Sequence, residues 1–218
     1  MIPRLPNPPL HRSIADVAED EFVRQLIDDP HWRGKLFHNI MGMPSRPRIL
    51  QRLPLAEAPG SFRGDADVVL FAPGAHEAVT AVEMKRIKIG ATSFASGEPN
   101  KLQEYAKAVQ QANLLAKVGF AQVYLYVLVV VDSRKNNNGE FTYAGPTPEL
   151  EARVRSVISL KDLEPRVGLI VHDFVQPMDH PPLELGTYGG QLHRLATPVP
   201  QALGIAEWIR RREQSPAG

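Results

Sequence analysis

Hydrophobic and polar positions follow two different periods along the chain, and each period predicts a different kind of element. Apolar residues three and four positions apart share one face of a helix, whereas alternate residues share one face of a strand. Helices are expected over residues 13–29, 101–117, 148–159 and 202–214. Strands are expected over residues 65–72, 77–86, 121–131 and 167–175.

Cap and turn residues predict where these elements begin and end. Ser13 followed by Asp16 resembles a capping box, and Asn100 is a suitable cap for the second helix, which should stop at Gly119. Residues 1–12 are expected to be extended, residues 30–60 irregular and residues 88–99 a flexible loop. Hairpin turns are expected at residues 136–139 and around Gly189.

The run Val123–Val131 is apolar at every position, which is typical of a strand that is buried on both faces. We therefore expect this strand to lie at the centre of a sheet. Helices and strands alternate along the first two thirds of the chain, and this order predicts a single α/β domain over residues 1–218 with a mixed central sheet.

Composition narrows the classes of protein that this chain can belong to. Its 43% hydrophobic and 22% charged residues are ordinary for a globular protein, and the absence of cysteine excludes disulfides and thiolate zinc sites. That absence fits a reducing cytoplasm, and we expect no membrane partner, because the longest apolar run is too short to span a bilayer. The net charge of +1 means that a nucleic-acid partner would need a local basic surface.

Charged residues occupy three strand positions where charge is usually disfavoured. Glu83 and Lys85 share one face of the second strand, and Asp67 can meet them if the first two strands are neighbours. Two carboxylates this close repel each other unless a cation or a proton lies between them. Mg²⁺ or Mn²⁺ would fit, since hard cations take oxygen ligands, and Lys85 could then steady a water or a phosphate. This arrangement suits metal-assisted phosphodiester hydrolysis.

A simpler interpretation of the same residues is a solvated surface pair, because Glu-x-Lys is common on half-exposed sheets. The strand that carries Glu83 and Lys85 is otherwise apolar, which argues against a solvated face.

The sequence "DVVLF…AVEMK" resembles the core of the PD-(D/E)XK nuclease superfamily, and is especially similar to archaeal-type Holliday junction resolvases. The resemblance implies a restriction-endonuclease-like fold, with helices around the sheet, a core over residues 13–131 and a C-terminal extension over 132–218. It also implies that Asp67 and Glu83 bind the metal, that the Met84 carbonyl adds a ligand and that Lys85 is catalytic. Ala66 stands where the motif's name has proline.

An acid on the first helix is a further candidate for the metal site. Positions three, four and seven after Glu19 are Phe22, Val23 and Leu26, so Glu19 should lie within the buried stripe of this helix. We expect it to point toward the metal; a local salt bridge or hydrogen bond is an equally good explanation.

Four residues near the strand end and the following helix are candidates for binding nucleic acid: Arg86, Lys88, Lys101 and Gln103. Gln103 could instead complete the cap begun by Asn100. The expected function is a magnesium-dependent nuclease that acts on DNA. Two alternatives are a catalytically inactive nuclease-fold module that binds nucleic acid or protein, and an unrelated structural α/β protein. The sequence leaves a homodimer open.

Overall fold

The structure is a computed structural model that describes residues 17–43, 46–132, 146–175 and 186–214. Within these residues, six strands form one mixed sheet in the order β1-β2-β3-β4-β5-β6. β3 and β4 run parallel, as do β4 and β5, and the other neighbours are antiparallel. The strands are β1 (Arg48–Pro54), β2 (Asp65–Phe71), β3 (Thr80–Ile89), β4 (Gln122–Val131), β5 (Gly168–Val175) and β6 (Gly186–Arg194).

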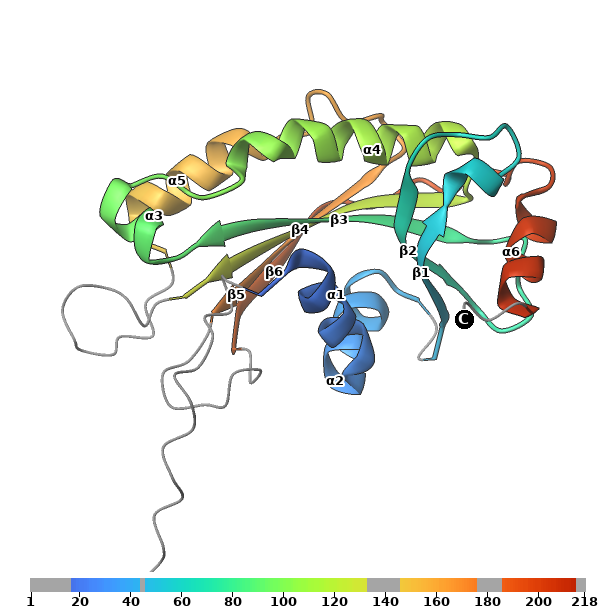
Figure 1. Ribbon diagram of the computed structural model, residues 1–218, viewed down its shortest axis with the longest axis horizontal. Helices are drawn as coiled ribbons and strands as arrows, with labels where there is room; N and C mark the ends of the chain where they lie inside the picture. Colours follow the sequence, from blue (N-terminus) through green and yellow to red (C-terminus); the bar gives the residue numbers. More distant parts are fainter. Residues whose placement is uncertain (1–16, 44–45, 133–145, 176–185, 215–218) are drawn as a thin grey trace, which may run out of the picture.

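Helices cover both faces of the sheet (Figure 1). The α-helices are α1 (Glu19–Asp28), α2 (Pro30–Arg33), α3 (Ala91–Ser96), α4 (Tyr105–Val118), α5 (Pro148–Val157) and α6 (Ile205–Gln214). A π-helix, η1 (Gly34–Ile40), follows α2, and short 3₁₀ turns, η2 (Leu55–Glu57) and η3 (Leu102–Glu104), follow β1 and precede α4. The mixed α/β architecture predicted from the sequence is therefore confirmed.

Alternate residues of the central strands contribute side chains to two hydrophobic cores, one on each face of the sheet. On one face, Ile87 and Leu125 pack with apolar residues of α4, α5 and α6. On the other face, Met84 and Tyr126 pack with residues of α1, α2 and η1. β4 is buried from Val123 to Val131 and lies between β3 and β5, which confirms its expected central position.

Several boundaries differ from those expected. Residues 30–60 were expected to be irregular but contain α2, η1 and β1, because an edge strand that is mostly exposed leaves no apolar run to mark it. Residues 88–99 are not a simple loop: β3 continues to Ile89 and α3 follows. Gly189 does not form a turn but pairs with Asp173 inside β6. The first helix begins at Glu19 within the described part; residues 13–16 and 136–139 lie outside it.

Asn100 does not cap a helix, contrary to the sequence expectation. Its backbone forms a bridge with Lys88, and its side-chain Nδ2 donates to Thr92 Oγ1 at 3.2 Å. α4 begins at Tyr105, after η3, and has no side-chain cap at its N-terminus. The cap proposed for Gln103 is therefore absent as well. The remaining helices and strands agree with the expected ones to within a few residues at each end.

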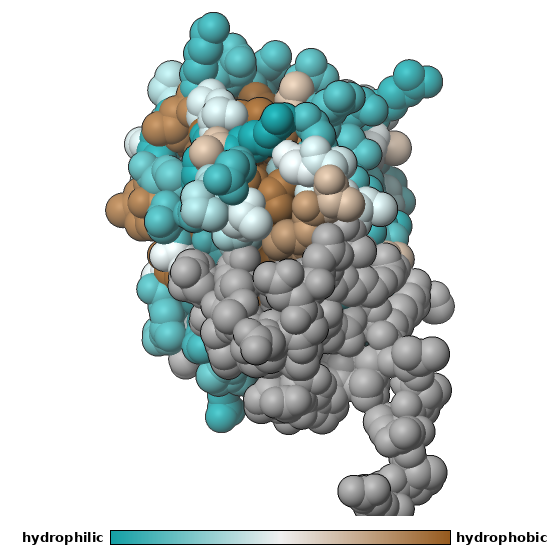
Figure 2. Space-filling model, turned by 90° about the vertical axis from the view of Figure 1, so that its left-hand side faces the viewer, coloured by the Kyte–Doolittle hydropathy of each residue, from teal (hydrophilic) through white to brown (hydrophobic). Residues whose placement is uncertain are grey.

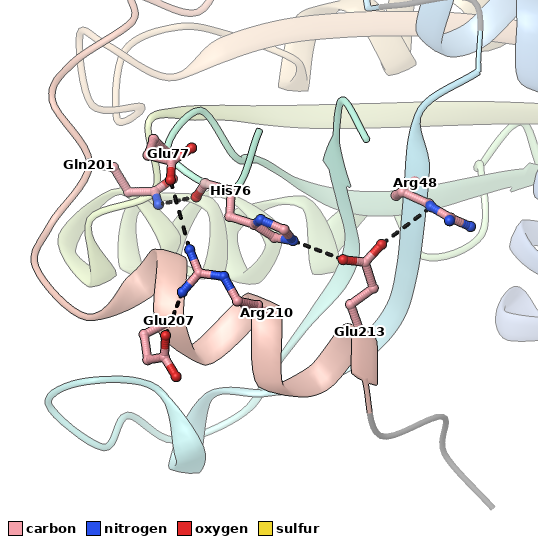
Figure 3. A network of polar contacts seen from close by, with 7 residues as sticks. All are labelled: Arg48, His76, Glu77, Gln201, Glu207, Arg210 and Glu213. Carbon is pink, nitrogen blue, oxygen red and sulfur yellow. Dashed lines mark hydrogen bonds and ion pairs between the residues drawn. The ribbon is translucent and has the colours of Figure 1, made fainter. Parts of the chain in front are cut away.

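A polar network fastens α6 to the turn between β2 and β3 (Figure 3). Glu213 accepts from His76 at 2.8 Å and pairs with Arg48 of β1 at 3.2 Å. Gln201 bridges the same turn, since its Oε1 accepts from Val79 N at 2.9 Å and its Nε2 donates to the His76 carbonyl at 2.7 Å. The C-terminal helix is thereby fixed beside β1.

In the part of the chain that the structure describes, no helix combines the length and apolar character needed to cross a membrane. Seen from the end that carries α3 and α5, hydrophobic surface residues are interspersed with hydrophilic ones (Figure 2).

Candidate metal and catalytic site

The candidate site lies where β2 and β3 separate. Their ladder is short and ends at the pair Val68 and Val82, so Asp67 and Glu83 come next along the two strands. Beyond this point β3 continues along β4. The backbone N–H of Met84 donates to Asp67 Oδ2 at 2.8 Å. The Asp67 side chain thus inserts into the opening between the strands, next to the backbone that carries Glu83.

Glu83 is buried without adequate compensation. Only 3% of its surface is exposed, and its Oε2 atom has no hydrogen-bond partner within the described structure. Burial and the negative charge of Asp67 raise the pKa of Glu83 to about 9, and the positive charge of Lys85 acts against this rise. Such a carboxyl holds a proton at neutral pH unless a cation replaces that proton.

Asp67 is affected in the same direction but less strongly. Burial raises its pKa to about 6, although the hydrogen bond from the Met84 N–H acts against this rise. The charges of Asp65 and Glu19 add to the increase, and that of Arg52 opposes it. Both neighbouring acids are therefore harder to ionise than free carboxyl groups.

Lys85 lies beside this pair but is held by two other carboxylates. Its Nζ atom is 2.8 Å from Glu104 Oε2 and 3.4 Å from Glu19 Oε1. Burial alone would lower the pKa of Lys85, but the hydrogen bond to Glu104 and the charges of Glu19 and Glu104 outweigh it and raise this pKa. Lys85 is therefore a protonated donor and not a base.

Glu19, the first residue of α1, lies beside the site but is half-buried and not part of the buried stripe that the sequence predicts. It lines a small pocket of about 30 Å³ together with Asp20, Val23, Gln51, Arg52, Asp67 and Met84. Its carboxylate also pairs with Lys85 and, at 3.5 Å, with Lys101. Both interpretations of Glu19 therefore have support, since it faces the pocket and also forms ion pairs.

The donor set fits a cation that needs few protein ligands. Among the described residues, no group of three or more acidic, histidine or cysteine side chains is placed to hold a metal ion, so Glu19 does not complete a three-acid cluster. Mg²⁺ commonly takes one or two carboxylates and fills its other positions with water and phosphate oxygens. Asp67, the orphaned Glu83 Oε2 and the Met84 carbonyl are donors of this kind.

The candidate nucleic-acid contacts occupy different environments. Arg86 is 1% exposed and lies on the α1 side of the sheet, with its Cζ atom 5.7 Å from the centre of the Phe22 ring. It does not reach the surface in this structure, which is a poor position for a phosphate contact. Lys88 is half-buried, whereas Lys101 and Gln103 are exposed near the rim of the site.

Sequence reasoning missed two charged residues of the site, Glu104 and Arg52. Glu104 precedes α4, and its contact with Lys85 depends on how that helix packs against β3. Arg52 lies in β1 with a φ of 50° and pairs with Asp20 at the pocket. Neither residue carries a signal in the sequence, because both act through tertiary contacts.

No family model, curated protein or solved structure matches this chain. Its function is therefore inferred from the geometry and electrostatics of the site.

Proposed function

We propose that this chain is a nuclease of the restriction-endonuclease-like fold that uses Mg²⁺ or Mn²⁺ to hydrolyse phosphodiester bonds in DNA. The observation that carries the proposal is the pair formed by the half-buried Asp67 and the buried Glu83, at the point where two strands separate, with Lys85 beside it. Unpaired buried carboxylates are costly, and they persist where a bound cation or a reaction needs them. The mixed sheet with helices on both faces also supports this fold.

In this proposal, Asp67, Glu83 and the Met84 carbonyl hold the cation. The cation supplies Lewis-acid activation of water and neutralises negative charge on the phosphate. The Met84 N–H fixes Asp67 in the orientation that faces the opening. Because Asp67 is already held, little reorganisation is needed when the cation binds.

Lys85 acts as a positive hydrogen-bond donor toward the phosphate or the attacking water. Its pKa is raised, so it stays protonated and does not remove the proton of the water. The ion pairs with Glu104 and Glu19 hold its amine near the acids until substrate arrives. Lys101, which also contacts Glu19 and is more exposed, is placed for an adjacent phosphate.

The test is metal-dependent cleavage of plasmid DNA by the purified full chain. Asp67→Ala and Glu83→Ala should each lower the cleavage rate by orders of magnitude, because the lost charge stabilisation is several kcal/mol and each ~1.4 kcal/mol is tenfold in rate. Asp28→Ala removes an exposed acid from the same helix as Glu19 and should cleave like the wild type.

Two results would overturn the proposal. One is equal cleavage by the wild type and both acid variants, which would indicate a contaminating nuclease. The other is no metal-dependent cleavage of duplex, junction or single-stranded DNA, or of RNA. If such an inactive protein still bound nucleic acid or protein, the inactive binding module would replace the nuclease as the explanation.

A further inference from the structure

A larger groove follows β1. It lies next to the small pocket that Glu19, Arg52 and Asp67 line, here called the acid pocket. The volume of the groove is about 550 Å³, and its walls are residues 48–54 of β1 with Phe71, Arg212 and Glu213. β1 is the first strand in the order of the described sheet, so the groove runs along an edge strand and is closed on one side by the end of α6. The network around Glu213 fixes that wall in place (Figure 3).

The groove and the acid pocket share part of their lining. Gln51 and Arg52 line both hollows, and Asp67 lines the pocket. Arg52 has a φ of 50°, a left-handed conformation that residues with side chains disfavour. Backbone strain of this kind is often found where a side chain must be aimed at a ligand. Arg52 therefore borders both the groove and the pocket that Asp67 lines.

The chemistry of the groove suits a phosphate backbone. Arg48, Arg52 and Arg212 contribute guanidinium groups, and Arg46 is exposed just before the strand. Each of the three lining arginines has a carboxylate partner, namely Glu213, Asp20 and Glu57 respectively. The side chains of Arg48 and Arg52 are 64% and 58% exposed, and ion pairs in such positions are weak. A guanidinium has five donors, so each arginine can also bind a phosphate.

The apolar lining favours a single strand, whose bases are unpaired and can contact side chains. The seven-residue strand β1 spans about 23 Å at ~3.3 Å per residue, so the groove is long enough for several nucleotides. The half-buried Ile49 and Leu50 offer apolar contacts to sugars or bases between the arginines. The pocket beyond Arg52, at about 30 Å³, is far too small for paired bases.

We propose that the backbone of a single nucleic-acid strand lies in the β1 groove and reaches the acid pair past Arg52. This inference rests on the proposed nuclease function and names the form of substrate that the site takes. An extended peptide added to the β1 edge is the competing occupant. The arginines and the lining that the groove shares with the acid pocket favour nucleic acid.

The test is binding of fluorescein-labelled single-stranded DNA of about 12 nucleotides to the full chain, a length within the usual site sizes for one strand. EDTA prevents cleavage, and fluorescence anisotropy is followed over a range of salt concentrations. Arg48→Ala and Arg212→Ala should each weaken binding about threefold to tenfold, and should lower the slope of log K against log salt by about 0.7. Arg48→Lys keeps the charge and should restore most of the affinity.

Arg153→Ala is the matched control, since Arg153 is an exposed arginine on α5 that pairs with Glu98. It should bind like the wild type. The proposal is overturned if both groove variants bind like the wild type, if Arg153→Ala loses as much affinity as they do, or if duplex DNA binds with equal affinity and equal sensitivity to Arg48→Ala.

Failure of the groove is distinguishable from failure of the nuclease proposal. Stabilisation of the wild type by Mg²⁺ without DNA tests the acid pair and does not involve the groove. If the protein is stabilised by Mg²⁺ and cleaves DNA, but binds DNA independently of Arg48 and Arg212, the nuclease proposal stands and the β1 groove is not the binding path. If the protein neither responds to Mg²⁺ nor cleaves DNA, but needs Arg48 to bind DNA, the groove is a binding site and the proposed catalytic site is wrong.

Discussion

At the scale of single residues, the molecule places several ionisable groups where their charge is poorly solvated. Glu83 is the extreme case, with one carboxyl oxygen buried and without a partner among the described residues. Lys85 shows the opposite arrangement, because two carboxylates hold it in its charged form. In the proposed function, this contrast leaves the acids to bind a cation while the lysine remains protonated.

Glu104 should position Lys85 for turnover. Glu104→Gln removes the charge partner at 2.8 Å, so the Lys85 amine should be held less firmly and its pKa should fall. Hydrogen bonds to charged groups contribute about 1.5–3 kcal/mol, so we expect roughly a tenfold to hundredfold loss in the rate of DNA cleavage. Stabilisation by Mg²⁺ should persist, as it should in Lys85→Ala. Glu98→Gln, which alters another exposed ion pair, is the control. Cleavage by Glu104→Gln at the wild-type rate would remove Glu104 from the site.

His172 should make the protein less stable in acid. Burial lowers its pKa to about 4, and the positive charge of Lys35 adds to this effect. Its ring stacks on Phe174, and Nδ1 lies 3.1 Å from the Tyr126 hydroxyl. Between pH 6.5 and 4, His172 is protonated in the unfolded chain but stays neutral in the folded chain. His172 therefore lowers the free energy of unfolding as the pH falls through this range.

The measurement for His172 is urea unfolding of the wild type and His172→Gln at pH 7 and pH 4.5. The wild type should lose more stability than the variant over this interval, because glutamine does not titrate. Taking the difference between the two proteins cancels the titration of distant acids. Equal losses would show that His172 is not buried in its neutral form.

At the scale of elements, two features shape the fold around the site: the end of the β2–β3 pairing and the C-terminus of α4. β2 and β3 pair only briefly, and the opening beyond Val68 admits the Asp67 side chain. α4 ends at Val118, and the φ of 101° at Gly119 allows the chain to turn into β4. A Cβ at this position would lie 2.4 Å from the Cβ of Ala202, so Gly119 also permits a close approach between segments.

Gly119→Ala should therefore destabilise the fold by about 1–3 kcal/mol, through backbone strain together with overpacking. Gly74→Ala is the matched control: its φ is also positive, at 79°, but no atom lies within 4 Å of the position of a new Cβ. The excess loss in Gly119→Ala, measured by urea unfolding, reports the clash alone. Equal losses in the two variants would contradict the close packing at Ala202.

Elements with a strong apolar signal could be predicted from the sequence, and those shaped by long-range contacts could not. The uninterrupted apolar run predicted β4 and its central position. The alternation of residues along the strands placed Asp67, Glu83 and Lys85 on two strands that are neighbours in the sheet. β1 was missed because it is an exposed edge strand with polar residues. The start of α4 was misplaced because Asn100 is drawn into a bridge with Lys88, which competes with local capping.

At the scale of the whole molecule, one sheet lies between two hydrophobic cores and carries both the candidate site and the β1 groove. β4 is the most protected strand in this arrangement, because it is buried and paired on both sides. Amide hydrogen exchange should therefore be slowest in β4 and faster in the edge strand β1, since core strands open only when the whole molecule unfolds. Exchange in β4 as rapid as in β1 would contradict the described sheet order.

The most direct test of the account is the melting temperature of the wild type and of Glu83→Gln as Mg²⁺ is added, with KCl keeping the ionic strength constant. If Asp67 and Glu83 hold the cation, the wild type gains about 2.7 kcal/mol at a hundredfold excess over Kd, or roughly 5–10 °C for a chain of this size. Glu83→Gln should keep the fold, because glutamine has nearly the same shape without the charge, and should not respond to Mg²⁺. An equal rise in both proteins, or no rise in the wild type, would contradict a metal site at these two acids.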